Sequence, residues 1–259
     1  MSRALAIANH KGGVGKTTIT HAIGAELARR GRRVLLVDLD PQAALTAAAG
    51  IADTAGRSLA EVIGGALPGR LPLVEAIRPI SPGLDLVPAD TELAAAELGL
   101  VSRMGREHVI GRAVAAVAGS YDLIAYDCPP ALGLLTVAGL VASEAVLVPT
   151  AARVSDLRAA AVFLRTVDQI AAELRPGLEV LGLVATFTDT RRRHDQEALE
   201  VMRRGGLPVW GPVPASVKIA EAAASGVDPI AYAGAGNPAA AALITIAEGI
   251  QKWLNSGQQ

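Results

Sequence analysis

The sequence predicts an α/β fold, a doubly wound, mostly parallel β-sheet with helices on both faces. Short apolar runs alternate with segments of helical spacing along the chain, which is the order that builds parallel sheets. Hydrophobic residues make up 51% of the 259 residues and aromatic residues only 3%, so Ala, Val, Leu and Ile must build the core. This composition is typical of parallel strands buried on both faces beneath alanine-rich helices.

The expected strands are short apolar runs that end at turn residues or at a glycine-rich loop. The run at 4–9 (ALAIAN) ends at such a loop, whereas 33–38 (RVLLVD) and the strand within 121–130 (YDLIAYDCPP) end in carboxylates. Ligands of doubly wound sheets bind beyond the carboxyl ends of the strands, so we expect a site there. The other strands are expected at 84–88, 145–149 and 178–187, and short elements of unassigned type at 208–213 and 216–224.

The expected helices lie between these strands. Helical spacing covers 17–30, where Arg29 and Arg30 suit the dipole of the last turn and Gly31 ends the helix. The segment 41–82 is rich in small residues and prolines, so short helices and loops are expected there. The other helices are expected at 91–99, 105–118, 133–142, 155–174, 194–204 and 238–254.

Charge and cysteine content narrow the class of protein. The net charge is −1, so a site for a polyanion must be a local patch. The single cysteine, Cys128, cannot form an internal disulfide, and no secretory signal precedes the first strand, which favours the cytoplasm. No apolar run approaches the roughly 18 to 20 residues of a membrane span. We expect one domain over 1–259, without an N-terminal helix-turn-helix module.

The stretch 9–20 (NHKGGVGKTTIT) fits most of the phosphate-binding pattern G-x-x-x-x-G-K-[ST], between a predicted strand and a predicted helix. His10 occupies the position of the first glycine, and Lys11 adds a second lysine. Lys16 would reach the β- and γ-phosphates, and the Thr17 hydroxyl would coordinate Mg²⁺. Backbone N–H groups at the helix N-terminus would surround the α- and β-phosphates. The residues expected to bind phosphate are Gly12, Gly13, Val14, Gly15, Lys16 and Thr17.

Three aspartates at strand ends are candidate catalytic or metal-binding groups, because a hydrolytic phosphate loop needs acidic groups near the γ-phosphate. Asp127 follows the apolar run DLIAY and would meet the metal through water. Asp38 and Asp40 lie on one side of their strand, facing away from Leu39, and could position Mg²⁺ and the attacking water. Taken alone, each of these aspartates is also compatible with a solvated turn or a cap.

Lys11 has two interpretations from physics alone. It cannot easily share a γ-phosphate that Lys16 already holds. It is therefore either a solvated loop lysine or a residue that points toward the nucleotide of another subunit. In the second case its charge would neutralise the developing negative charge in trans, as an arginine finger does.

Three motifs, KGGVGKTT, VLLVDLDPQ and YDLIAYDCPPALG, together resemble those of the ParA/MinD family of deviant Walker A ATPases. Similarity extends over nearly the whole chain, and the match is best to ParA-type partition proteins, including the Soj-like ones. The resemblance implies a P-loop NTPase fold with ATP and Mg²⁺ as ligands. It also implies that Lys11 is the signature lysine, which crosses the interface of an ATP-sandwich homodimer, and that His10 is a normal replacement for glycine.

The resemblance implies roles for further residues. Asp40 would be needed for hydrolysis, with Asp38 nearby, and Asp127 would be the Walker B carboxylate. Thr17 would ligate Mg²⁺, and Thr18 would contact the α-phosphate side.

The family builds its adenine pocket from a strand end and a later loop. These positions correspond here to Thr186 and Phe187, at the strand end, and to the loop around Pro214. Phe187 could stack on the base, although an aromatic residue at a strand end belongs to the core more often.

ParA-type relatives bind DNA non-specifically as ATP dimers, and a ParB-like centromere-binding partner stimulates hydrolysis. In the segment ATFTDTRRRHDQ, Arg191 matches the arginine of the family pattern Y-D-x-R, and Arg192 and Arg193 follow it. Lys218 matches a second basic position. Such contacts would give sequence-independent, salt-sensitive binding, unless the run is simply a solvated face. Relatives often read P-R-N where this chain reads P-A-S at 214–216, so DNA affinity could be lower or rest on the arginine run.

Membrane binding of the MinD type is not favoured by the C-terminal helix. The segment 242–254 has an apolar face but one lysine, Lys252, offset by Glu248, whereas a membrane-surface helix usually carries several basic residues. The sequence therefore predicts a cytoplasmic, nucleoid-associated ATPase that segregates plasmid or chromosomal DNA. The alternatives are a MinD-like or orphan switch that positions a protein cargo, and an ATP-dependent metabolic enzyme.

Overall fold

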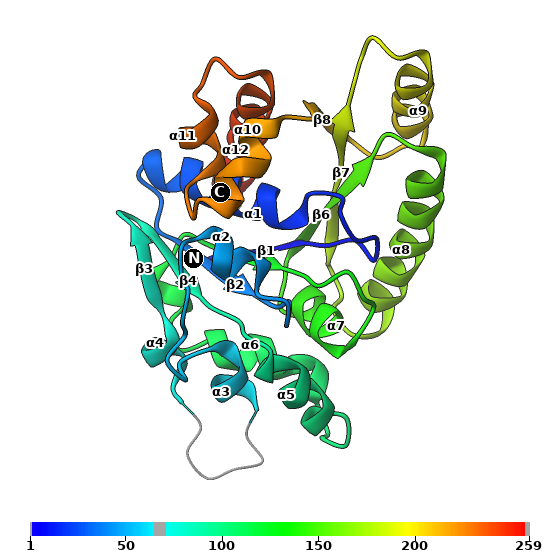
Figure 1. The fold of residues 1–259 in the computed structure, drawn as a ribbon. Helices are drawn as coiled ribbons and strands as arrows, with labels where there is room; N and C mark the ends of the chain where they lie inside the picture. Colours follow the sequence, from blue (N-terminus) through cyan, green and yellow to red (C-terminus); the bar gives the residue numbers. More distant parts are fainter. Residues whose placement is uncertain (1, 65–70, 257–259) are drawn as a thin grey trace.

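Eight strands form one sheet in the computed structural model, which describes residues 2–64 and 71–256 (Figure 1). Their order is β3-β4-β2-β5-β1-β6-β7-β8, and all neighbours are parallel except β3 and β4, which are antiparallel. This confirms the predicted doubly wound, mostly parallel sheet. The strands are β1 (Arg3–Ile7), β2 (Val34–Asp38), β3 (Arg78–Ser81), β4 (Leu84–Val87), β5 (Leu123–Asp127), β6 (Ala145–Ala151), β7 (Glu179–Thr188) and β8 (Val209–Pro214).

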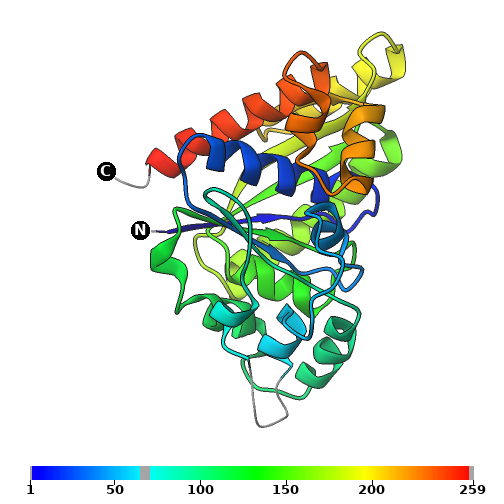
Figure 2. The same ribbon diagram turned by 60° about the vertical axis from the view of Figure 1, so that its left-hand side comes forward.

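Helices cover both faces of the sheet, as the composition predicts. One face is covered by α1 (Lys16–Arg29), α2 (Ala44–Ala48), α10 (Val217–Ala224), α11 (Pro229–Ala233) and α12 (Pro238–Ser256). Figure 2 shows α1 and α12 side by side on that face. The other face is covered by α3 (Leu59–Ile63), α4 (Leu73–Ala76), α5 (Glu92–Leu100), α6 (Val109–Val114), α7 (Leu134–Val141), α8 (Val154–Glu173) and α9 (Arg193–Arg204). None of the helices in the described part of the chain is long and apolar enough to cross a membrane.

Successive residues of the central strands enter two separate cores. In β1, Leu5 and Ile7 pack into the core beneath α1 and α12, whereas Ala6 packs into the core on the opposite face. All three side chains are fully buried. Because alternate residues of a strand point to opposite faces, a continuous apolar run is what a strand covered on both sides requires.

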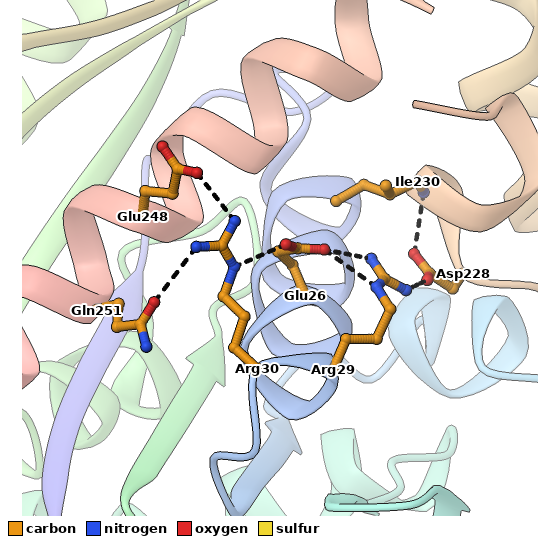
Figure 3. Close-up of polar contacts among 7 residues, drawn as sticks. All are labelled: Glu26, Arg29, Arg30, Asp228, Ile230, Glu248 and Gln251. Atoms are coloured by element: carbon orange, nitrogen blue, oxygen red, sulfur yellow. Dashed lines mark hydrogen bonds and ion pairs between the residues drawn. The ribbon is translucent and has the colours of Figure 1, made fainter. Parts of the chain in front are cut away.

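A charged network fixes α1 against the C-terminal helices (Figure 3). Glu26 accepts hydrogen bonds from Arg29 at 2.8 and 3.0 Å and from Arg30 at 2.7 Å. Arg30 also donates to Glu248 of α12 at 3.0 Å, and Arg29 pairs with Asp228, which caps α11. The helix that begins at the glycine-rich loop is thus held at its far end.

Three regions differ from the expectation, and the simplest case is α11, which lies where no helix was expected. Within 41–82 the short helices α2, α3 and α4 are present, but β3 was not expected, because Pro79 disguises this edge strand; residues 65–70 lie outside the described part. The expected helix at 105–118 is interrupted: a 3₁₀ turn η1 (Arg106–His108) precedes α6, and a second turn η2 (Ala118–Ser120) follows it. Gly105 has a left-handed φ of 64° and Gly111 lies inside α6, and both weaken a continuous helix.

Candidate functional site

The glycine-rich loop joins the carboxyl end of β1 to the first residue of α1. Gly13 and Gly15 have φ values of 71° and 89°, a left-handed conformation that residues with a side chain rarely adopt. The buried Asn9 fixes the start of the loop, because its Nδ2 donates to the Pro149 carbonyl at 2.7 Å and its Oδ1 accepts from the Lys11 N–H at 3.1 Å. The loop is therefore attached to the neighbouring strand β6.

The two lysines of the motif lie in different surroundings. Lys16 is buried, and its ammonium donates to the Lys11 carbonyl at 3.1 Å. Burial lowers the pKa of Lys16, and the nearby Asp127 carboxylate opposes this shift. The Lys11 side chain is half exposed, and its Nζ lies 3.5 Å from Oδ1 of Asp156, a buried residue in the first turn of α8. The two ammonium groups therefore do not compete for one position.

Asp127 ends β5 and contacts the first turn of α1. Thr17 Oγ1 donates to Asp127 Oδ2 at 2.7 Å, and Thr20 Oγ1 donates to Oδ1 at 3.3 Å. Burial raises the pKa of Asp127, and the charge of Asp38, its register partner on β2, raises it further. A cation beside these carboxylates would reverse the shift. The Thr17 hydroxyl and the Asp127 carboxylate are hard oxygen ligands of the kind that Mg²⁺ takes, so the residues present fit this metal.

Asp38 and Asp40 differ in what they contact. Asp38 is fully buried, and its carboxylate accepts from the Thr46 N–H and hydroxyl at 2.9 and 2.8 Å and from the Asp40 N–H at 3.0 Å. Burial raises the pKa of Asp38, and the bonds from Thr46 oppose this. The Thr46 hydroxyl accepts in turn from the Ala89 N–H at 2.9 Å. Asp40 is only half-buried, and its Oδ1 accepts from the Gln42 N–H at 2.9 Å.

A cavity of about 160 Å³ opens beside the loop, against β7 and β8. Phe187 is 45% exposed and has a left-handed φ of 51°, which is unusual for an aromatic residue, so it is not a core residue. Thr186 Oγ1 donates to the Val14 carbonyl at 3.0 Å and attaches β7 to the loop. The predicted residues Gly15, Thr18, Thr186, Phe187 and Pro214 all line this cavity, with Ser216, Ile219 and Leu243 among the others.

The three neighbouring arginines are exposed, but each has an acidic neighbour. Arg191 and Arg192 pair with Asp189 at 2.9 and 3.4 Å, and Arg193 pairs with a glutamate of its own helix at 2.8 Å. Lys218 is exposed in α10, which follows β8, the strand next to β7. These residues therefore lie beyond the ends of adjacent strands, and the charge of the arginine run is partly balanced locally.

The sequence analysis missed four residues that shape the site. Asn9 and Thr20 lie beside the motif, and a polar side chain at the end of an apolar run was an available signal for Asn9. Thr46 and Asp156 had no such signal, because their contacts with Asp38 and Lys11 depend on how distant segments meet.

Comparison with known proteins supports the same kind of site. A family model described as an AAA domain (AAA_31) matches residues 2–180. The chromosome partitioning protein ParA of Caulobacter vibrioides is 37% identical over 235 residues, which are 89% of this chain and 87% of that protein. The sporulation initiation inhibitor protein Soj of Bacillus subtilis is 35% identical over 235 residues, covering 90% of this chain and 92% of Soj.

Among solved structures, the fold is similar to that of cobyrinic acid a,c-diamide synthase from Mycobacterium smegmatis with a bound ATP analogue and magnesium. The TM-score is 0.85 at 36% identity, and the match covers 99% of this chain and 97% of the other. The similarity therefore includes the whole sheet and the strand ends that form the site.

Proposed function

The chain belongs to the ParA/MinD family of deviant Walker A P-loop ATPases, and we propose that it acts as a ParA-type partition ATPase. Its ligands are ATP and Mg²⁺, the pair that the M. smegmatis structure holds as analogue and metal. The observation that carries the proposal is the arrangement at the start of α1. Lys16, Thr17 and Asp127 converge beside a cavity that Phe187 lines.

Each residue of the site has a role that its surroundings support. Lys16 binds the β- and γ-phosphates, and the N–H groups at the start of α1 surround them. Thr17 and Asp127 hold Mg²⁺, which when bound neutralises charge on the phosphate oxygens. Asp40, more exposed than Asp38, accepts a hydrogen bond from the attacking water and orients it, while Asp38 fixes the backbone that carries Asp40.

The adenine ring occupies the cavity between the loop and β8. Phe187 stacks on its face, and the apolar side chains of Ile219 and Leu243 line the cavity opposite the loop. Support comes from the exposure and left-handed backbone of Phe187, because strain of this kind is found at functional sites more often than elsewhere.

Lys11 provides the link to a second subunit. Its ammonium is half exposed and does not occupy the Lys16 position, so it is available to a phosphate outside its own loop. In the proposed ATP-bound homodimer, Lys11 exchanges Asp156 for a phosphate of the opposite nucleotide. This neutralises charge in trans in the way an arginine finger does.

The ATP-bound dimer binds DNA without sequence preference through Arg191, Arg192, Arg193 and Lys218. Their location beyond adjacent strand ends supports one shared surface. Because acidic neighbours already pair with the three arginines, each phosphate contact must replace an existing ion pair, and we expect weak, strongly salt-dependent binding. A ParB-like centromere-binding partner stimulates hydrolysis, releases the protein from the nucleoid and so drives segregation.

A direct test compares oligomeric state and DNA binding with a non-hydrolysable ATP analogue, ADP or no nucleotide, all with Mg²⁺. We expect a dimer by analytical ultracentrifugation, and retention of DNA fragments of unrelated sequence, only with the analogue. Lys16→Ala should lose both. A protein that dimerises with the analogue but binds anionic vesicles instead of DNA would favour the MinD-like alternative.

A second candidate function is favoured by one observation, the similarity to cobyrinic acid a,c-diamide synthase. An ATP-dependent amide synthase would show ATP turnover that depends on cobyrinic acid together with ammonium or glutamine. Cys128 could not serve as the nucleophile of a glutamine-hydrolysing step, because it is buried and burial raises the pKa of its thiol. Turnover that rises with cobyrinic acid and not with DNA would select this function.

A further inference from the structure

The connection between α5 and α6 forms a basic pocket that the nucleotide site does not use. A cavity of about 230 Å³ is lined by Leu100, Arg103, Met104, Arg106, Val109 and Arg112. We call this set the arginine pocket. It lies on the sheet face opposite α1 and α12, near the bottom of Figure 1.

Two guanidinium groups of the arginine pocket are held in place by backbone oxygens. Arg106 donates to the Val101 carbonyl, and Arg112 donates to the Gly105 carbonyl at 2.8 Å. Within residues 2–64 and 71–256, neither group forms an ion pair with a carboxylate. A guanidinium has five N–H donors, so each retains donors for an anion, in contrast to the paired Arg191–Arg193 run.

An apolar rim borders the pocket. Leu98, Val101 and Met104 are 75%, 54% and 98% exposed, although they lie within seven consecutive residues. Scattered apolar residues on a surface are normal, but a local group beside the guanidinium groups of Arg106 and Arg112 is typical of an interaction site. The chemistry of the surface is therefore both cationic and apolar.

The rim is one residue from a contact with α7, the helix that follows the Asp127 loop. Glu97 Oε1 accepts a hydrogen bond from the Leu135 N–H at 3.1 Å, in the first turn of α7. The loop from Asp127 leads directly into this turn, and η1 packs against α7. A ligand on the last turn of α5 can therefore change the loop that follows the Asp127 carboxylate.

We propose that the arginine pocket and its rim bind an acidic, amphipathic segment of a partner protein. Carboxylates pair with Arg106 and Arg112 as charge-assisted forks, and apolar side chains cover Leu98 and Met104. DNA would satisfy the arginines but leave the rim exposed, so a peptide fits better. The effect of the segment on hydrolysis rests on the proposed function, but its binding does not.

The test is selection of random 12-residue peptides displayed on phage against the immobilised full-length protein. We expect the wild-type chain to enrich peptides in which Glu or Asp flanks Leu, Ile or Phe. The affinity of an enriched peptide, measured by fluorescence anisotropy, should fall at least tenfold in the double variant Arg106→Glu/Arg112→Glu and in Met104→Asp. Arg165→Glu, an exposed arginine of α8, should change it less than twofold.

Further variants separate loss of binding from loss of folding. Arg106→Lys/Arg112→Lys retains the charge and should keep at least a third of the affinity. Glu97→Ala removes the acceptor of the Leu135 N–H, so this variant should bind the peptide normally but lose any effect of the peptide on ATP turnover. The proposal is overturned if acidic peptides are not enriched, if the protein self-associates through Met104, or if the charge-reversed variant binds the peptide equally well. Anionic vesicles or DNA that displace the peptide with higher affinity also overturn it. Absence of ATP turnover in every sample, with peptide binding intact, would contradict the proposed function alone.

Discussion

At the scale of single residues, Lys11 has two competing anionic partners. In the structure its ammonium pairs with Asp156 of its own chain, and in the proposed dimer it pairs with a phosphate of the opposite nucleotide. An ion pair with one half-exposed partner contributes about 0–1 kcal/mol. The exchange therefore opposes dimer formation only weakly, but by an amount that can be measured.

Replacing Asp156 should strengthen dimerisation. Asp156→Asn removes the charge that holds Lys11 in its own chain, so the dissociation constant of the analogue-bound dimer should fall about two- to fivefold, as the loss of one such pair implies. Sedimentation velocity over a concentration series measures this. Asp168→Asn, on the exposed side of α8, is the matched control. Unchanged or weaker dimerisation would show that Asp156 does not compete for Lys11.

Replacing Asp40 should separate binding from hydrolysis. Asp40→Ala removes the half-buried carboxylate assigned to the attacking water but leaves Asp38 and Thr46 in place. We expect turnover to fall at least about 100-fold, the usual contribution of such a group, while Mg²⁺-ATP affinity stays within about twofold. Asp53→Ala, an exposed turn aspartate, should retain activity. Normal turnover in Asp40→Ala would refute the assignment.

At the scale of elements, α1 is held at both ends. Its first turn contacts Asp127 through Thr17, and its last turn contacts α11 and α12 through Arg29 and Arg30 (Figure 3). Both arginines converge on Glu26, whose side chain is mostly buried. The helix that carries the phosphate site therefore depends on a charged group far from it.

The stability of this network should depend on pH. Burial alone would raise the pKa of Glu26, but the hydrogen bonds from Arg30 and Arg29 outweigh it and lower the pKa. A carboxylate with a lowered folded-state pKa contributes stability above its unfolded pKa of about 4.3 and loses it as pH falls through the folded value. Glu26→Gln should reduce the free energy of unfolding by about 2 kcal/mol at pH 7, with a smaller difference near pH 3.

Urea unfolding of wild type and Glu26→Gln at the two pH values measures this difference. Glu248→Gln is the control, because the Glu248 side chain is 47% exposed and pairs with Arg30, and it should lose less than about 1 kcal/mol. An equal loss at both pH values would assign the effect to packing and not to the charge of Glu26.

The proposed DNA contacts lie beyond the ends of β7 and β8. Their contribution to DNA affinity can be measured from the dependence of that affinity on salt concentration. Arg191→Ala should reduce the slope of log affinity against log salt by about 1 while leaving analogue-dependent dimerisation intact. Arg33→Ala is the matched control, because Arg33 is also exposed and ion-paired but precedes β2, at the amino ends of the parallel strands. An unchanged slope in Arg191→Ala would place the DNA surface elsewhere.

At the scale of the whole molecule, the sequence was sufficient for the features that local patterns specify. Apolar runs and the glycine motif predicted a mostly parallel sheet, the alternation of strands and helices along the chain, and the position of the phosphate loop. It was insufficient where the outcome depends on which segments meet. Nothing in the triple-arginine run shows that Asp189 neutralises part of it, and β3 carries a proline, Pro79, that disguises an edge strand. The pairing of Lys11 with Asp156 likewise exists only after α8 packs beside the loop.

Thr46 has a consequence for how distant changes reach Asp40, the aspartate proposed to act in hydrolysis. Its hydroxyl donates a hydrogen bond to Asp38 and accepts one from the N–H of Ala89, just after β4. The backbone that presents Asp40 is thereby anchored to the outer strands of the sheet. Thr46→Val keeps the shape of the side chain but removes its hydrogen bonds with the Asp38 carboxylate and the Ala89 N–H, which are buried. We expect this to cost about 1–3 kcal/mol. A shift of β3 and β4 would therefore move the backbone of Asp40, and with it the position proposed for the attacking water, without any contact with the nucleotide.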